Sequence, residues 1–116
     1  MEEAWSVEIW GVRGAAPAAY RDFLEYGGNT SCISVDCCGE TVIFDAGTGL
    51  LELVRRLRKK GIKRVHILLS HLHMDHICGL YGFPLFLDAA AEIHLYGRAE
   101  EGRLKELMVA ALTIQY

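Results

Sequence analysis

Four side chains that can bind metal ions lie within six consecutive positions, namely His71, His73, Asp75 and His76. They follow residues 62–70, whose hydrophobic pattern predicts a mostly buried strand. Side chains alternate in extended backbone, so His71 and His73 project to the same side and can share one ion. Asp75 and His76 come where the chain turns into a helix, from which they can reach a second ion. Zinc accepts imidazole and carboxylate ligands, and manganese and iron(II) also accept both.

The other histidines that lie in strand patterns contrast with this cluster. His66 and His94 each stand isolated within a predicted strand. Isolated histidines of this kind usually serve packing or surface roles, so both are predicted to be structural.

The elements that position the cluster are predicted from hydrophobic periodicity and turn residues. Alternation at residues 5–9 favours a half-buried strand, and residues 32–36 and 41–45 form two strands joined by a short turn. Residues 50–60 have helical periodicity, with Thr48 as the cap and Gly61 as the left-handed residue after the end. Four positions form the buried stripe of this helix: Leu50, Leu53, Val54 and Leu57.

The second part of the chain continues the alternation of strands and helices. A helix is predicted from about Asp75 with an interruption at Pro84, then a strand at residues 92–96 and an amphipathic helix at 101–113. A helix between two strands favours a crossover unit. The predicted fold class is α/β (α+β), with a mixed sheet covered by helices on one face and one domain over residues 1–116.

The pattern His-x-His-x-Asp-His resembles the signature of the metallo-β-lactamase superfamily. Three other segments are similar to the N-terminal half of that superfamily in the same order: residues 11–17, 26–31 and 44–49. They are closest to the branch that contains ribonuclease Z and related cyclic-phosphodiester hydrolases. The resemblance implies the N-terminal half of an αββα sandwich, over residues 7–97 or so.

The resemblance also implies roles for individual residues. It assigns His71 and His73 to a first metal, and Asp75 and His76 to a second, with Asp75 also orienting the nucleophile. Asp45 resembles the buried aspartate that supports the histidine loop without binding metal; a turn aspartate that satisfies local backbone is an equal alternative. Asn29 and Thr30 resemble residues that shape the loop beside the site.

Superfamily members are longer and supply further metal ligands from a second half. No residue after His76 fits those roles, since His94 lies inside a strand and Asp88 in a helical region. The chain is therefore expected to be the N-terminal fragment of a longer enzyme, or else a complete protein that pairs with another chain. An exposed sheet face would then favour homo-oligomers, and the isolated chain would be nearly inactive.

Composition and charge limit the function classes. The sequence is 52% hydrophobic and 23% charged, as in ordinary globular proteins, and its net charge is −3. No apolar run approaches a membrane span, and the acidic N-terminus is unlike a secretory signal, so the cytoplasm is the expected location. Adjacent Cys37 and Cys38 do not indicate a disulfide framework, and reduced thiols without a metal role are expected.

A basic cluster lies at residues 55–64, which hold seven of the twelve lysines and arginines. It could contact an RNA backbone, but the absence of interleaved aromatic residues favours a solvated helix face whose cations complement the helix C-terminus.

The predicted function is a metal-dependent hydrolase, preferably of small or nucleotide-type phosphodiesters, that uses a hydroxide bridging two divalent ions. RNA is a less favoured substrate; ester, thioester and lactam stay open. The alternatives are a catalytically inert metal-binding module or subunit, and iron-dependent redox or sulfur chemistry on the same scaffold.

Overall fold

The computed structural model describes residues 4–80 and 91–98, together with residues 103, 104 and 106. Within these residues a five-stranded sheet has the order β1-β2-β3-β4-β5. The strands are β1 (Ser6–Gly11), β2 (Cys32–Cys37), β3 (Glu40–Phe44), β4 (Arg64–Leu68) and β5 (Glu92–Tyr96). The first two pairings are antiparallel, and β4 pairs in parallel with both β3 and β5. The mixed sheet confirms the predicted fold class.

Helix α1 (Leu50–Lys59) covers one face of this sheet. Its four predicted stripe residues are buried, and they pack with Val65 and Ile67 of β4. Gly61 after the helix has the left-handed φ of 70° that was predicted for it. Burial of this stripe explains why the 3.6-residue period of the sequence becomes a helix on the sheet.

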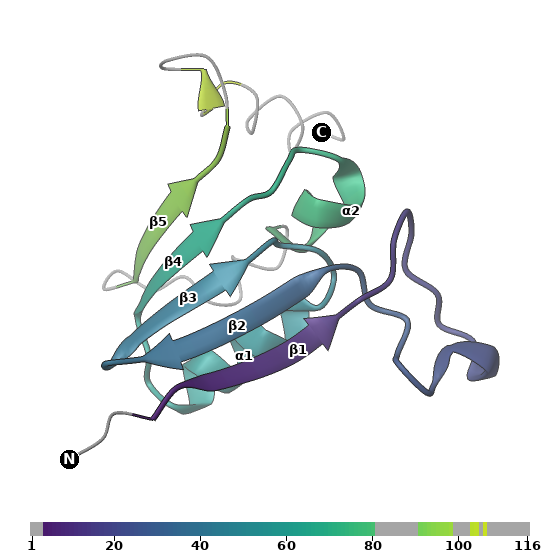
Figure 1. Ribbon diagram of the computed structural model, residues 1–116, viewed down its shortest axis with the longest axis horizontal. Coiled ribbons are helices and arrows are strands. Elements are labelled where there is room, and N and C mark those ends of the chain that lie inside the picture. Colours follow the sequence, from purple (N-terminus) through teal and green to yellow (C-terminus); the bar gives the residue numbers. More distant parts are fainter. Residues whose placement is uncertain (1–3, 81–90, 99–102, 105, 107–116) are drawn as a thin grey trace.

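The opposite sheet face, called the open face below, carries no helix in the described part of the chain (Figure 1). Val7 and Ile9 of β1 are 63% and 65% exposed there, and Phe44 of β3 is 42% exposed. Alternation explains the contrast, because Ile43 and Ile67 point to the α1 side and are fully buried.

Two predicted details differ in the structure. Thr48 does not cap α1: Gly49 occupies the N-cap without a side-chain hydrogen bond, and the Thr48 hydroxyl donates instead to Asn29 Oδ1 at 3.1 Å. The strand predicted at residues 62–70 is shorter, since β4 ends at Leu68. The interruption at Pro84 and most of the helix at 101–113 lie outside the described residues.

Two short helices complete the described elements. The 3-10 helix η1 (Arg21–Phe23) lies in a long loop that projects from the end of β1 (Figure 1). Helix α2 (Met74–Ile77) follows β4 and begins one residue before the predicted start. Among the described helices none is long and apolar enough to cross a membrane.

Candidate metal centre

The four residues His71, His73, Asp75 and His76, called the histidine motif below, lie between the end of β4 and helix α2. The ring of His71 is 4.5 Å from that of His73 and 4.1 Å from that of His76, measured between centroids. Asp75 Oδ2 lies 3.3 Å from His76 Nε2. The structure therefore brings all four predicted ligands together. Within the described residues, however, no three of their donor groups converge on one point.

Asp45 connects the motif to the end of β3. Its Oδ1 accepts hydrogen bonds from the backbone N–H and the hydroxyl of Ser70, at 2.8 and 2.9 Å, and its Oδ2 lies 3.0 Å from His76 Nδ1. The Ser70 hydroxyl also lies 2.9 Å from His71 Nδ1. Asp45 thus contacts the histidine loop directly and through Ser70, a residue that the sequence analysis did not select.

The backbone at Asp45 adopts the left-handed conformation, with φ of 63°. Aspartate tolerates this region better than most residues with a side chain. The turn carries the chain from β3 into the loop that packs against α2, where Ala46 N–H donates to the carbonyl of His76 at 2.8 Å. The same turn therefore holds both the Asp45 side chain and the α2 backbone.

Two glycines permit the close approach of these loops. A Cβ atom at Gly79 would lie 1.9 Å from the carbonyl oxygen of Gly47, and one at Gly47 would lie 2.5 Å from the carbonyl oxygen of Asp75. Both distances are far inside van der Waals contact. Glycine is therefore required where the β3–α1 loop meets α2.

Asn29 and Thr30 lie at the base of the projecting loop. Thr30 is fully buried; its N–H donates to the Thr48 hydroxyl at 2.9 Å, and its own hydroxyl accepts from Thr48 N–H at 2.8 Å. These bonds tie the loop to the start of α1. Both residues shape the structure beside the motif, and neither contacts its four side chains in a hydrogen bond that the structure shows.

The Asp75 carboxylate has a shifted pKa. Partial desolvation acts to raise its pKa, but the hydrogen bond from Ala15 N–H (3.1 Å) and the neighbouring imidazoles of His76 and His71 outweigh this, so its pKa is lowered. The carboxylate therefore stays ionised at neutral pH, in the form that can bind a metal ion.

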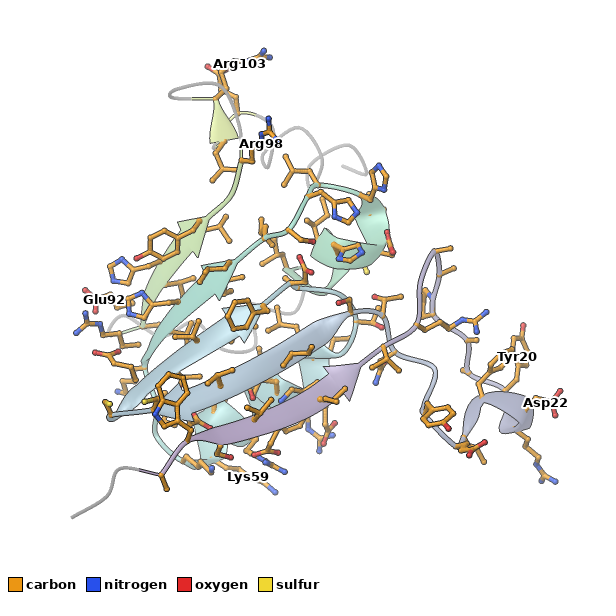
Figure 2. All side chains as sticks on the ribbon, in the orientation of Figure 1. Tyr20, Asp22, Lys59, Glu92, Arg98 and Arg103 are labelled. Atoms are coloured by element: carbon orange, nitrogen blue, oxygen red, sulfur yellow. The ribbon has the colours of Figure 1, made fainter. Side chains whose placement is uncertain are left out.

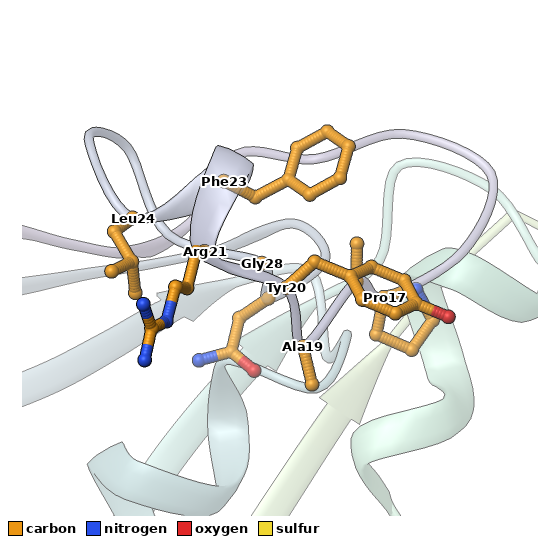
Figure 3. Close-up of a pocket in the computed structure, with 9 residues that line it drawn as sticks. Pro17, Ala19, Tyr20, Arg21, Phe23, Leu24 and Gly28 are labelled. Atoms are coloured by element: carbon orange, nitrogen blue, oxygen red, sulfur yellow. The ribbon is translucent and has the colours of Figure 1, made fainter.

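A pocket of about 430 Å³ lies in the projecting loop, beside η1 (Figure 3). Tyr20, Phe23 and Leu24 contribute apolar surface to it, and Gly28 and Asn29 also line it. None of the four motif residues lines this pocket, so it is separate from the metal-binding side chains.

The chain is similar in sequence to a known family of proteins. A model of the metallo-beta-lactamase superfamily matches residues 26–111, about three quarters of the chain. The chain belongs to this superfamily. The match confirms the resemblance stated from the motifs, and it includes β2 to β5 and the whole histidine motif.

Several ribonucleases Z are similar to this chain. The enzyme of Nanoarchaeum equitans is 33% identical over 94 residues, which are 78% of this chain and 28% of the relative. That of Haloarcula marismortui is 34% identical over 76 residues, 66% of this chain and 22% of the relative. The chain therefore spans about a quarter of the length of these two relatives.

Among solved structures, a diphosphatase of the PhnP family is similar, with a TM-score of 0.59 and 18% identity. The alignment covers 95% of this chain and 47% of that one. This likeness confirms the fold.

Proposed function

We propose that the chain carries part of the metal centre of a hydrolase that cleaves phosphodiester bonds. The observation that carries this proposal is the gathering of His71, His73, Asp75 and His76 at the end of β4, with ring centroids 4.1 to 4.5 Å apart. Strand ends next to loops and helix starts are common places for active sites in folds of this kind.

The donor set fits divalent ions that accept nitrogen and oxygen ligands. His71 and His73 would hold one ion, and Asp75 and His76 a second. Zinc is the preferred identity, and manganese or iron(II) would accept the same ligands. When bound, such ions act as Lewis acids and lower the pKa of water, which supplies a nucleophile near neutral pH.

The residues around the motif orient its imidazoles. A metal-binding histidine usually donates its second ring N–H to a carboxylate or another acceptor, which fixes the tautomer. Asp45 lies 3.0 Å from His76 Nδ1, and Ser70 Oγ 2.9 Å from His71 Nδ1. In both rings Nε2 is then the nitrogen left to bind an ion. These contacts favour a positioning role for Asp45 over the role of a turn aspartate, and we propose that role for it.

Asp75 has two tasks in this proposal. Its lowered pKa keeps the carboxylate charged as a ligand, and its oxygen beside His76 can accept a hydrogen bond from the attacking water, which orients it. Ala15 N–H fixes this side chain from the projecting loop. Asn29 and Thr30 hold the base of the same loop, and so act on the site through its backbone.

The names of the relatives support a phosphodiester as substrate. A ribonuclease acts on the phosphodiester bonds of RNA, and the similarity to two ribonucleases Z makes RNA a stronger candidate than the basic cluster suggested. In that cluster Arg55 pairs with Glu52 at 3.1 Å, and Arg56 with Glu8. The proposal therefore places substrate cleavage at the histidine motif and assigns no RNA contact to α1.

The described residues give two ligands to each ion, whereas catalytic zinc sites usually have three protein ligands. We therefore expect weak metal binding and little turnover by the 116-residue chain alone. We also expect self-association, because Val7 and Ile9 leave apolar side chains exposed on the open face. Size-exclusion chromatography measures this association.

The test compares the parent chain with His71→Ala, His73→Ala and, as a control inside the same segment, Met74→Ala, whose side chain is 49% exposed. Bound zinc, manganese and iron are measured in each, together with hydrolysis of bis(p-nitrophenyl) phosphate by the monomer. Metal content should fall in both histidine variants and not in Met74→Ala.

Three outcomes would change the proposal. Unchanged metal content in both histidine variants would refute the assigned ligands. Metal binding without hydrolysis, even when the chain is joined to the segments that its relatives contain, would favour an inert metal-binding module. Robust turnover by the monomer that disappears in His73→Ala would show that the expectation of weak activity is wrong.

A further inference from the structure

His66 of β4 and His94 of β5, called the strand pair below, form a second histidine cluster. They are direct partners in the parallel register of the two strands. Their rings stack, with centroids 4.9 Å apart and planes inclined by 16°. The sequence showed each histidine as isolated, so only the register reveals that the two imidazoles share one place on the open face.

Two carboxylates face the strand pair. Glu40 Oε2 lies 3.5 Å from His66 Nε2, and Glu92 Oε1 lies 3.5 Å from His94 Nε2. Arg64 joins the two acids, at 3.7 Å from Glu40 and 3.3 Å from Glu92. Figure 2 shows Glu92 at the start of β5, at the end of the sheet away from α2. The strand pair and its acids are therefore separate from the histidine motif.

The Tyr96 hydroxyl supports one of the two rings. It lies 3.2 Å from His66 Nδ1. When Nδ1 carries the proton and donates to this oxygen, the lone pair of His66 lies on Nε2, the nitrogen beside Glu40. This is the arrangement in which a hydrogen-bonded imidazole binds a metal ion through its other nitrogen.

His94 Nε2 lacks a hydrogen-bond partner. The atom is buried, although 39% of the side chain is exposed, and no described group forms a hydrogen bond with it; Glu92 Oε1 lies 3.5 Å away. An unsatisfied buried polar atom is costly and needs an explanation, such as a role in binding an ion. Two imidazole nitrogens beside two carboxylates are ligands that divalent transition-metal ions accept.

We propose that the strand pair binds one divalent transition-metal ion through His66 Nε2 and His94 Nε2, with Glu40 or Glu92 as a further ligand. Zinc, copper(II) and nickel(II) accept this combination of nitrogen and oxygen donors. The strand register fixes the backbone positions of the two histidines. Within the described residues no three such donor groups converge on one point, so binding requires one ring to turn out of the stack towards the ion. The carboxylates belong to side chains that are 44% and 57% exposed, so they can turn from Arg64 to the ion.

This site does not depend on the proposed hydrolase function, and the experiment keeps the two apart. The background is the 116-residue chain with His71→Ala, His73→Ala and His76→Ala, in which every histidine of the motif is replaced. Copper(II) is titrated into this variant, and the binding isotherm is recorded with the electron paramagnetic resonance spectrum. We expect one equivalent of copper(II) with hyperfine coupling to two imidazole nitrogens.

Variants of the strand pair then test the ligands. His66→Phe and His94→Phe keep a planar ring in the stack, so they preserve packing while removing the donor nitrogens. Each should reduce copper(II) affinity at least tenfold and remove the coupling to two nitrogens. Circular dichroism and a melting curve without metal establish that each variant is folded; if either phenylalanine variant fails to fold, His94→Gln takes its place.

Two results would overturn the proposal. One is an unchanged spectrum and affinity in both ring variants. The other is loss of the copper(II) equivalent in a Cys37→Ser/Cys38→Ser variant while the strand pair is intact, because this would assign the ion to the adjacent thiols. Glu40→Gln and Glu92→Gln identify the carboxylate ligand, and the one that binds should lose several-fold in affinity.

Discussion

The two histidine clusters of this chain both involve β4, yet they are built in different ways. The histidine motif follows the strand and depends on a loop network through Asp45 and Ser70. The strand pair lies within the sheet, where the ladder between β4 and β5 fixes its register, and it has one supporting hydroxyl, that of Tyr96. The histidine motif can be recognised from its spacing in the sequence, but its side chains are oriented by a network of loop residues. The strand pair cannot be recognised from the sequence, and strand pairing alone brings its two rings together.

Because the loop network supports only the histidine motif, a change in it should weaken metal binding at the motif and leave the strand pair intact. Asp45→Asn keeps the size of the side chain and tolerates the left-handed backbone, but it removes the charge beside His76. Metal affinity at the motif should fall about 10–100-fold, as for other residues that orient metal ligands. Titration with a competing chelator measures this loss.

The matched control is Asp36→Asn, because Asp36 accepts a hydrogen bond from Thr41 at 2.8 Å in the β2–β3 hairpin and touches neither cluster. Equal losses in the two aspartate variants would contradict the positioning role of Asp45. A loss of copper(II) binding at the strand pair in Asp45→Asn would show that the two clusters are coupled.

The second prediction concerns the close contact behind the motif. Gly79→Ala places a methyl group 1.9 Å from the Gly47 carbonyl oxygen, and backbone on both sides prevents an easy adjustment. Forcing extra atoms into a packed site costs about 1–3 kcal/mol. The free energy of unfolding, measured by urea denaturation, should fall by this amount, and metal binding at the motif should weaken with it.

Gly14→Ala is the control for that substitution, since a Cβ atom there meets nothing within 4 Å. It should leave stability and both metal sites unchanged. A Gly79→Ala protein as stable as the parent would show that the β3–α1 loop moves freely against α2, and the account of the rigid scaffold would be wrong.

Much of the fold could be predicted, because its elements follow local patterns. The buried stripe from Leu50 to Leu57 and the alternation of Val65, Ile67 and Leu69 give the layers directly. The four residues of the motif lie within six positions, so their proximity needs no long-range information. The superfamily match confirms the identification that these residues suggested.

The remaining features depend on contacts that local patterns do not encode. His66 and His94 are 28 residues apart, and only the strand register makes them neighbours. The role of Ser70 could not be predicted either, because it depends on the hydrogen bonds that this residue donates to Asp45. Thr48 looked like a helix cap, but its hydroxyl bonds to the Asn29 side chain and the Thr30 backbone, and this tertiary contact replaces the local one.

The third prediction concerns the Cys32 thiol, which is buried on the covered face of the sheet. Burial, and secondarily the charge of Asp45, raise the pKa of the Cys32 thiol from 9.0 to about 12. The thiol is then neutral in the folded chain but ionises in the unfolded chain near its ordinary pKa. Stability from this group is complete below pH 9 and is lost as the pH rises towards 12.

At pH 10 the loss should be about 1.4 kcal/mol, which follows from 1.36 kcal/mol per pKa unit. Urea denaturation of the parent and of Cys32→Ala at pH 8 and pH 10 measures it as the difference in pH dependence. The parent should lose more stability than the variant. A pH dependence that is identical in both would mean that Cys32 is accessible to water and that the covered face is not closed.

The smallest effect is expected at Tyr96, whose contact with His66 is the counterpart of the contact between Asp45 and the motif. Tyr96→Phe keeps the ring that stacks at 6.0 Å from His66 and removes the hydroxyl 3.2 Å from Nδ1. Tyr96 is 49% exposed, so water can replace the lost hydrogen bond. Stability should fall by only about 0.5 kcal/mol, and copper(II) affinity at the strand pair only a few-fold, with no change at the motif. Urea denaturation and copper(II) titration in the His71→Ala/His73→Ala/His76→Ala background measure the effects on stability and on the strand pair, and chelator competition in the chain with an intact motif measures the effect there. A loss as large as that expected for Asp45→Asn would mean that the strand pair also needs an oriented support, and that register alone does not build a metal site.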